Sequence, residues 1–333
     1  MITIHPKSKD NIKQSVKPVL VVGVPRSGST WTARVLSQAP NTVYIHEPDN
    51  EFNNILGCHA KKKLSRFPYL KATSMDRSYY NLWKNVFYSG MITNSKTINM
   101  ILYGFSELFK ITTGYQILPL YRNSRSNDNT LLSRHKRRFQ NWHQSVRFPI
   151  RIVKSVHAGF ALPFISRHFD PEIVIIFRHP ANIAASYLKL NMPDRDRMLY
   201  RDHQMVRDYL APYIPNIQKL HEPLELIGLQ IGIFYYIWEQ QIKINTSWQT
   251  LTHELLCLDS IDQFKKIYKR LNLKWTDNVK VFIQKNNQPG RGFQTQRILL
   301  EEPEKWKLKL SRKQIQQIRR GYHLLPVEHY NDF

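Results

Sequence analysis

The chain has 333 residues, and 42% of them are hydrophobic, so it can fold around a sizeable core and wholesale disorder is excluded. Its 49 lysine and arginine residues outnumber its 25 aspartate and glutamate residues, which gives a formal net charge of +24. A charge of this sign attracts nucleic acids, anionic lipids, acidic glycans and nucleotides alike, so it indicates only the sign of the partner.

The first part of the chain predicts a tail, two strands and an insertion. Residues 1–17 are polar, lack the apolar core of a signal peptide and predict a flexible tail. The β-branched run at residues 19–23 predicts a buried parallel strand, residues 30–38 a helix, and residues 42–46 a second strand. From about residue 50 to residue 147 the pattern loosens into aromatic, helix-like pieces, which predict a helical insertion covering one edge of the ligand site.

Regular alternation of strands and helices resumes after the insertion. Strands are predicted at residues 148–154, 172–177 and 247–253, and helices at residues 160–168, 180–190, 198–210, 225–245 and 260–271. Such an order predicts an α/β fold, a P-loop-like, doubly wound and mostly parallel sheet flanked by helices. We expect a single domain over residues 18–333, with the insertion inside it.

The cysteine content and the apolar runs bear on the compartment. Cys58 and Cys257 are the only cysteines, too few for a disulfide framework or a zinc site, and no metal requirement is expected. The longest apolar run, residues 226–238, is too short to cross a bilayer and predicts a buried helix. We therefore expect a soluble, cytoplasmic protein, with peripheral contact to a membrane surface left open.

Four of the predicted strands end in residues that suit a ligand site. These strands end at Gly23, at His46 and Glu47, at Lys154, and at Arg178. Because doubly wound sheets bind ligands at the carboxyl ends of their strands, a glycine loop, a carboxylate, a lysine and an arginine should converge on one rim.

The first of these strands runs into the sequence GVPRSGST at residues 23–30, called here the phosphate loop. Gly23 and Gly28 have the spacing of a phosphate-binding loop, and a helix beginning near Ser29 would point its positive end at a bound anion. Ser29 stands where nucleotide hydrolases keep a lysine, and no magnesium-binding aspartate is evident. The loop therefore indicates a phosphate-bearing ligand but gives weak support to triphosphate chemistry.

The stretch VGVPRSGSTW, residues 22–31, resembles the 5′-phosphosulfate loop of sulfotransferases that use 3′-phosphoadenosine 5′-phosphosulfate (PAPS). The resemblance implies that the donor is held by Arg26, Ser27, Gly28, Ser29 and Thr30. It also implies that Arg26 assists the leaving group and that Trp31 stacks on adenine. The likeness extends over residues 18–48, 148–190 and 247–322, although THEL at residues 252–255 departs from the family pattern.

A second motif resembles the part of this family that binds the 3′-phosphate. Arg178 follows a predicted strand and Ser186 lies eight residues further on, as in the family. An arginine suits a phosphate because its guanidinium fork can bond two oxygens. The stretch QPGRGFQTQR, residues 288–297, loosely resembles the family's last phosphate loop, with Arg291 and Arg297 as candidates, although a flexible hinge is an equal alternative.

Sulfuryl transfer to a hydroxyl group needs a base near the acceptor, and three residues compete for this role: Glu47, His157 and His46, the last of which is more typical of a packing residue at a strand end. Glu47 lies in HEP, which resembles the FEP of carbohydrate sulfotransferases. His157, in KSVHAGF, resembles the Lys-Thr-His of cytosolic members but sits one residue further along. Lys154 could bridge the sulfate oxygens. The family chemistry implies PAPS as the sulfuryl donor and requires no metal.

The acceptor and two rival functions remain open at this point. A glycan or glycolipid is favoured over a small alcohol, and the basic runs at residues 61–63 and 134–138 suggest that it is anionic. A P-loop kinase or NTPase is the nearest enzyme alternative. A basic nucleic-acid-binding protein is the alternative from another class, suggested by the net charge and by SRHKRRF at residues 133–139.

Overall fold

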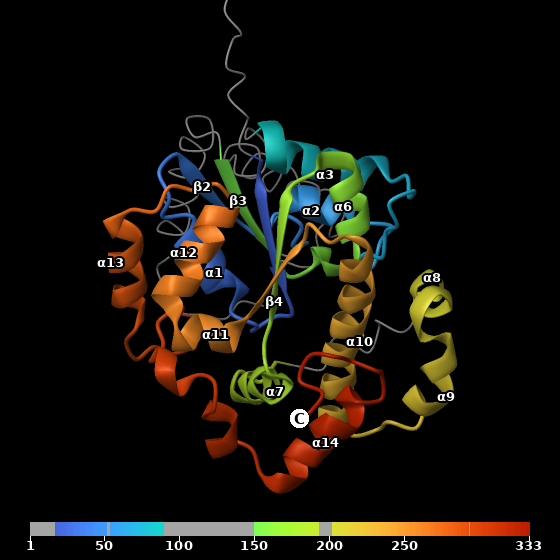
Figure 1. Cartoon of the computed structure of the whole chain (residues 1–333). Coiled ribbons are helices and arrows are strands. Elements are labelled where there is room, and N and C mark those ends of the chain that lie inside the picture. The colour runs from blue at the N-terminus through green and yellow to red at the C-terminus, as the bar shows by residue number, and fades with distance from the viewer. Residues whose placement is uncertain (1–16, 52–53, 90–149, 193–201, 293) are drawn as a thin grey trace, which may run out of the picture.

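The computed structural model describes residues 17–51, 54–89, 150–192, 202–292 and 294–333 (Figure 1). All but the last residue of the predicted tail, the part of the predicted insertion from residue 90 onward and the basic run at residues 133–139 lie outside the described residues. So do the first four residues of the helix predicted at 198–210.

The centre of the fold is a sheet of five parallel strands in the order β2-β3-β1-β4-β5. The strands are β1 (Val19–Gly23), β2 (Thr42–His46), β3 (Ile150–Ser155), β4 (Glu172–Phe177) and β5 (Gln249–Thr252). β1 is an apolar run, β4 is apolar after its first residue, and β3 is buried throughout although it carries Arg151 and Lys154, as expected of central parallel strands covered on both faces. The predicted parallel, doubly wound sheet is therefore confirmed.

Helices cover both faces of the sheet (Figure 1). One face carries α1 (Ser29–Leu36), α11 (His253–Leu258), α12 (Ser260–Arg270) and α13 (Asp277–Asn286). The other carries α2 (Ile55–Ala60), α3 (Arg77–Lys84), α6 (Leu162–Phe169), α7 (Pro180–Lys189), α10 (Pro223–Ile244) and α14 (Arg312–Tyr322). Alternate residues of β1 serve the two layers, since Leu20 and Val22 pack into one core while Val19 and Val21 pack into the other.

Shorter helical pieces connect these layers. Two are the α-helical turns α8 (His203–Met205) and α9 (Ile214–Ile217), and two are π-helical, at Asn85–Ser89 and Val206–Leu210. The 3₁₀ turns are Ala158–Phe160, Ala211–Tyr213, Leu299–Glu301 and Lys305–Leu308. In the described part of the chain, no helix is long and apolar enough to span a membrane.

The helical stretch predicted at residues 198–210 is confirmed over residues 203–210, where α8 runs directly into a π-helical turn. A 3₁₀ turn and α9 follow without a break. Pro212 and Pro215 each lie in the first turn of one of these two pieces, where the N–H that a proline lacks would have no helical partner. In the described part of the insertion, residues 55–60 and 77–89 are helical, whereas residues 61–76 are not.

Helices α10 and α14 pack unusually closely because glycines line their contact. A Cβ at Gly321 would lie 1.8 Å from the Glu225 carbonyl oxygen, and one at Gly228 would lie 2.2 Å from the Ile318 carbonyl oxygen. A capping box closes the first turn of α10, and Ser311 caps the start of α14 in the same way. This helix pair supports the face of the sheet behind β4 (Figure 1).

The last residues of the chain pack behind the end of β4. The ring of His329 stacks on Phe177 with centroids 3.7 Å apart, and its backbone N–H donates to Glu239 of α10 at 2.8 Å. Phe333 is nearly buried and packs on His179, with ring centroids 4.6 Å apart. This C-terminal segment, residues 323–333, therefore braces the point at which the chain leaves the sheet.

Candidate active site

Residues that follow β1, β2, β3 and β4 surround one cleft of about 1070 Å³ at the carboxyl edge of the sheet, the lower edge in Figure 1. Parallel pairing aligns these strand ends, with Gly23 beside Ile176 and His46 beside Lys154. The predicted site residues that line the cleft are Arg26, Gly28, Ser29, Thr30, Trp31, Glu47, Lys154, His157, Arg178 and Arg297. The structure thus brings together most of the positions that the sequence singled out.

The phosphate loop makes a tight turn into α1, which begins at Ser29 as predicted. Gly28 has a φ of 93°, and a Cβ there would lie 2.1 Å from Cδ2 of His253, so only glycine fits. Ser27 is fully buried, its N–H donates to the Val24 carbonyl at 2.9 Å, and its Oγ faces Gly23. Ser27 therefore supports the turn from inside and does not line the cleft.

Arg26 lies across the cleft from β1 toward α7. Its Nε donates to Ser186 Oγ at 2.9 Å, and its Nη2 donates to the Gly292 carbonyl at 3.3 Å. Burial, together with the charges of Arg297 and Arg178, lowers the pKa of Arg26 to about 10. A guanidinium held among like charges is poised to receive an anion. Ser186 thus contacts Arg26, whereas the sequence motif pairs it with Arg178.

Arg178 leaves the end of β4 and reaches the phosphate loop. Its backbone is fixed by Tyr235, whose hydroxyl accepts from the Arg178 N–H at 2.7 Å and donates to its carbonyl at 2.6 Å. Its Nη1 donates to the Arg26 carbonyl at 2.8 Å and its Nη2 to Glu302 at 2.8 Å. The side chain is buried, and its Nε has no hydrogen-bond partner among the described residues.

Trp31 and the two arginines of the late glycine segment differ in how they meet the cleft. Trp31 is only 4% exposed and packs edge-on against Phe264, with centroids 5.3 Å apart, so little of its ring reaches the cleft. Arg297 lines the cleft and donates to the Gly292 carbonyl at 3.0 Å. Arg291 is exposed and lines neither the cleft nor the recess beside it.

Glu47 and Lys154 form a buried ion pair on the other side of the cleft. The second carboxylate oxygen of Glu47 accepts from Asn50 at 2.8 Å, and its backbone N–H donates to the Lys154 carbonyl at 2.7 Å. Burial on its own would raise the pKa of Glu47, but the Lys154 ammonium outweighs it and holds that pKa well below its usual range. The carboxylate is therefore ionised and able to accept a proton.

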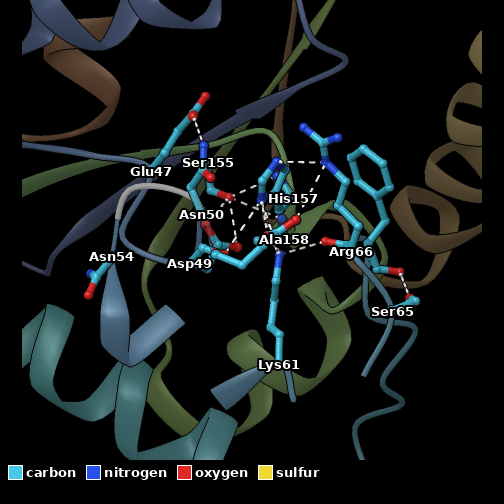
Figure 2. Close-up of polar contacts among 12 residues, drawn as sticks. Glu47, Asp49, Asn50, Asn54, Lys61, Ser65, Arg66, Ser155, His157 and Ala158 are labelled. Carbon is cyan, nitrogen blue, oxygen red and sulfur yellow. Dashed lines mark hydrogen bonds and ion pairs between the residues drawn. The ribbon is translucent and has the colours of Figure 1, made fainter. Parts of the chain in front are cut away.

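His157 lies beside this pair in a cluster of charged groups (Figure 2). Its Nδ1 is 3.1 Å from Lys61 Nζ, and its Nε2 is 3.4 Å from Arg66 Nε. Burial and the Lys61 charge lower the pKa of His157 to about 3, so the ring is neutral. Lys61 is itself buried and pairs with Glu51 at 2.5 Å. Of the basic run at residues 61–63, Lys61 is therefore buried and paired, and only Lys62 and Lys63 are exposed.

Sequence reasoning missed three buried groups of the site. Asp49, fully buried below Glu47, accepts from Ser155 Oγ at 2.7 Å, and burial raises its pKa to about 6. His253 packs against the phosphate loop, and Glu302 pairs with Arg178. Asp49 follows HEP directly and could have been found from that motif, whereas nothing in the sequence links Glu302 to a strand end 124 residues earlier.

No metal centre emerges from this arrangement. Within residues 17–51, 54–89, 150–192, 202–292 and 294–333, no group of three or more histidine, cysteine, aspartate or glutamate side chains could hold an ion. Cys58 and Cys257 are both free thiols. The groups that converge on the cleft are instead cations around a glycine loop, together with the carboxylates of Glu47 and Glu302.

A sequence model described as the sulfotransferase family matches residues 18–277 of the chain. No curated protein sequence gives a significant match. Among solved structures, the sulfotransferase domain from the curacin biosynthetic pathway is 11% identical, with 91% of this chain and 96% of that one covered and a TM-score of 0.43. The sulfotransferase domain of the Synechococcus PCC 7002 olefin synthase is 13% identical, with 95% and 98% covered and a TM-score of 0.46.

A third solved structure is sulfotransferase STF9 from Mycobacterium avium, which is 13% identical, with 94% of this chain and 78% of that one covered and a TM-score of 0.38. All three superpositions are loose, so the assignment rests on the family model. Because that match spans most of the chain, and includes the phosphate loop, Glu47, Lys154 and Arg178, the chain belongs to the sulfotransferase family.

Proposed function

We propose that this protein transfers a sulfuryl group from PAPS to the hydroxyl group of an acceptor. The observation that carries the proposal is the contact of Arg178 with the phosphate loop, where its Nη1 donates to the Arg26 carbonyl at 2.8 Å. This contact puts an anion-binding loop and a buried arginine within the span of one nucleotide that bears phosphates on both its 5′ and 3′ oxygens. Family membership supports the same donor.

The cations of the cleft divide naturally between the two ends of the donor. The phosphate loop and Arg26 would hold the 5′-phosphosulfate, with the amino end of α1 directed at it. Arg178 and Arg297 would hold the 3′-phosphate. The exposed edge of Trp31 would limit the adenine side of the cleft, in place of the full stacking that the family resemblance implies.

The transfer itself needs little more than alignment and charge. The acceptor oxygen attacks sulfur in line, the S–O bond to the 5′-phosphate breaks, and adenosine 3′,5′-bisphosphate leaves with the bond electrons. Arg26 and Lys154 would stabilise the charge that develops on the phosphate and sulfuryl oxygens. Glu47 would take the acceptor proton, since it is ionised and sits beside Lys154 at the cleft wall.

For the acceptor we propose a glycan or glycolipid hydroxyl, with an anionic acceptor preferred over a neutral one. The cleft is lined mainly by polar and basic side chains, which suits a hydroxyl-rich molecule. The net charge of +24 favours a negatively charged acceptor over a neutral one. A small alcohol is the second choice because it would offer fewer groups to the polar and basic lining of the cleft.

Nucleotide binding tests the donor assignment most directly. We expect adenosine 3′,5′-bisphosphate to bind more tightly, by calorimetry, than ATP with Mg²⁺ or NAD. The Arg178→Ala variant should lose at least several-fold of that affinity because it removes a charge-assisted phosphate contact. Arg167→Ala, an exposed change on α6, serves as the control and should bind like the wild type. Tighter binding of ATP with Mg²⁺, or full affinity in Arg178→Ala, would overturn the proposal.

A further inference from the structure

A small recess of about 70 Å³ opens beside the main cleft and is surrounded by basic side chains. The basic residues that line it are Arg26, Arg178, Lys189, Arg297, Lys305 and Lys309. Among all its lining residues, Glu302 is the only acid, and it also lines the main cleft. We call this space the basic recess. Its small size and basic lining suit a tetrahedral anion such as a phosphate group.

The Glu302 carboxylate lies close to three of the cations that line the basic recess, Arg178, Lys305 and Arg297. One oxygen accepts from Arg178 Nη2 at 2.8 Å, the other accepts from Lys305 Nζ at 2.6 Å, and Arg297 Nε lies 4.0 Å away. The side chain is only 4% exposed. Burial on its own would raise the pKa of Glu302, but Arg178 and Lys305 outweigh it and keep that pKa below its ordinary value. Glu302 is therefore a buried, fully charged anion.

The backbone around Glu302 is anchored by hydrogen bonds, so a displacement of its carboxylate would have to come from rotation of the side chain. Its N–H donates to the Leu299 carbonyl at 3.1 Å, and the next residue, Pro303, accepts from Asn182 of α7 at 2.8 Å. Arg178, by contrast, keeps its buried Nε without a partner among the described residues. Arg178 thus has an N–H that the Glu302 carboxylate does not satisfy.

We propose that Glu302 is a built-in competitor of the donor's 3′-phosphate. In the free protein its carboxylate neutralises Arg178 and Lys305, and a bound 3′-phosphate displaces it from them. The inference rests on the proposed function, because it needs the 3′-phosphate at Arg178. It makes Glu302 a residue that sets nucleotide affinity and lets the spent bisphosphate leave, since the carboxylate re-forms its ion pairs as the phosphate departs.

A role for Glu302 in positioning Arg178, instead of competing with the phosphate, would change nucleotide affinity in the opposite direction when Glu302 is replaced. If the carboxylate served only to hold Arg178 in place for the phosphate, its loss would weaken binding of every adenine nucleotide that uses the cleft. If it competes with the 3′-phosphate, removing its charge strengthens binding, and only for nucleotides that carry a 3′-phosphate. The two roles differ in both the sign and the ligand dependence of the effect.

The test is calorimetric titration of wild type and Glu302→Gln with adenosine 3′,5′-bisphosphate and with adenosine 5′-phosphate, at one ionic strength. We expect Glu302→Gln to bind the bisphosphate about tenfold or more tightly than the wild type, and the monophosphate within about twofold. Glu301→Gln makes the same chemical change at an exposed neighbouring position and should match the wild type. An unchanged or weaker bisphosphate affinity, or an equal gain for both nucleotides, overturns the inference.

Two further measurements keep the outcomes distinct. Glu302→Asp retains the negative charge but moves it away from the cations by the length of one methylene group. This variant should fold even if Glu302→Gln does not. It should show a smaller gain of affinity for the bisphosphate. No gain in Glu302→Asp would count against the inference in that case. Equal affinity of the wild type for the two nucleotides would overturn the donor assignment, and the inference with it. A wild-type preference for the bisphosphate that neither variant increases overturns the inference alone.

Discussion

Glu47 and His157 stand near one another at the cleft wall, yet they sit in different surroundings. Glu47 is ionised through Lys154, while His157 is neutral among Lys61 and Arg66. Since the pKa of Glu47 is held below its usual range and that of His157 is about 3, both are deprotonated at neutral pH. The pH dependence of turnover therefore cannot separate them in the free enzyme, whereas substitution can.

Glu47→Gln should abolish most turnover while leaving nucleotide binding intact. The amide can still accept a hydrogen bond from Lys154 but cannot take a proton, so we expect a loss of about 100-fold or more in kcat. The affinity for adenosine 3′,5′-bisphosphate should stay within about threefold of the wild type, because Glu47 lies outside the phosphate loop. Transfer assays and calorimetry on the same preparation give both values.

His157→Gln is the matched comparison for the Glu47 variant. It should keep most of its activity if Glu47 is the base. Full activity in Glu47→Gln together with its loss in His157→Gln would assign the proton transfer to His157. Melting temperatures of both variants show whether a loss reflects chemistry or a disturbed cluster.

At the level of single side chains, the sequence predicted which residues lie at the cleft better than it predicted their hydrogen-bond partners. Arg26, Glu47, Lys154 and Arg178 all lie at the cleft, because strand ends in a parallel sheet share one edge. Ser27 turns inward instead, because the tight turn buries it. Hydrogen-bond partners depend on rotamers and on distant loops, which the spacing of a motif does not contain.

At the level of elements, the contact of α10 with α14 leaves very little room for side chains. Gly321→Ala should lower the free energy of unfolding by about 1–3 kcal/mol or more, because its Cβ would meet the Glu225 carbonyl at 1.8 Å. Urea unfolding measures this loss. Gln316→Ala, an exposed position on the same helix, should change stability by no more than about 0.5 kcal/mol. Equal stability of the two variants would show that the helices separate without cost.

The predicted elements were most accurate where burial alone decides them. The predicted bounds of β1, β2 and β4 agree with the structure, because β1 and β4 are short, largely apolar runs and β2 alternates between buried and less buried residues. The predicted strand at residues 247–253 shortened to β5, and residue 253 instead begins α11. The stretch at residues 203–217 shows the limit, since it changes from α to π to 3₁₀ and back to α geometry, which the periodicity of apolar residues does not reveal.

At the level of the whole molecule, the net charge of +24 should act on the choice of acceptor. At low salt, a sulfated or uronate-bearing saccharide should react with a kcat/KM several-fold above that of a neutral saccharide of equal length, because long-range attraction raises its rate of encounter. This advantage should shrink as salt approaches about 0.2 M, where screening confines charges to their near neighbours. Equal rates at low salt would rule out an electrostatic preference.

The C-terminal segment should influence the proposed nucleotide site although it lies outside that site. Stacking of His329 on Phe177 and the edge-on contact of Phe333 with His179 fix the two residues that flank Arg178 in the sequence. None of the residues of that segment lines the cleft. An affinity tag fused behind Phe333, or a trimmed end, should therefore affect Arg178, the arginine proposed to hold the donor, through its two neighbours in the sequence. Handles for purification belong at the other end of this polypeptide.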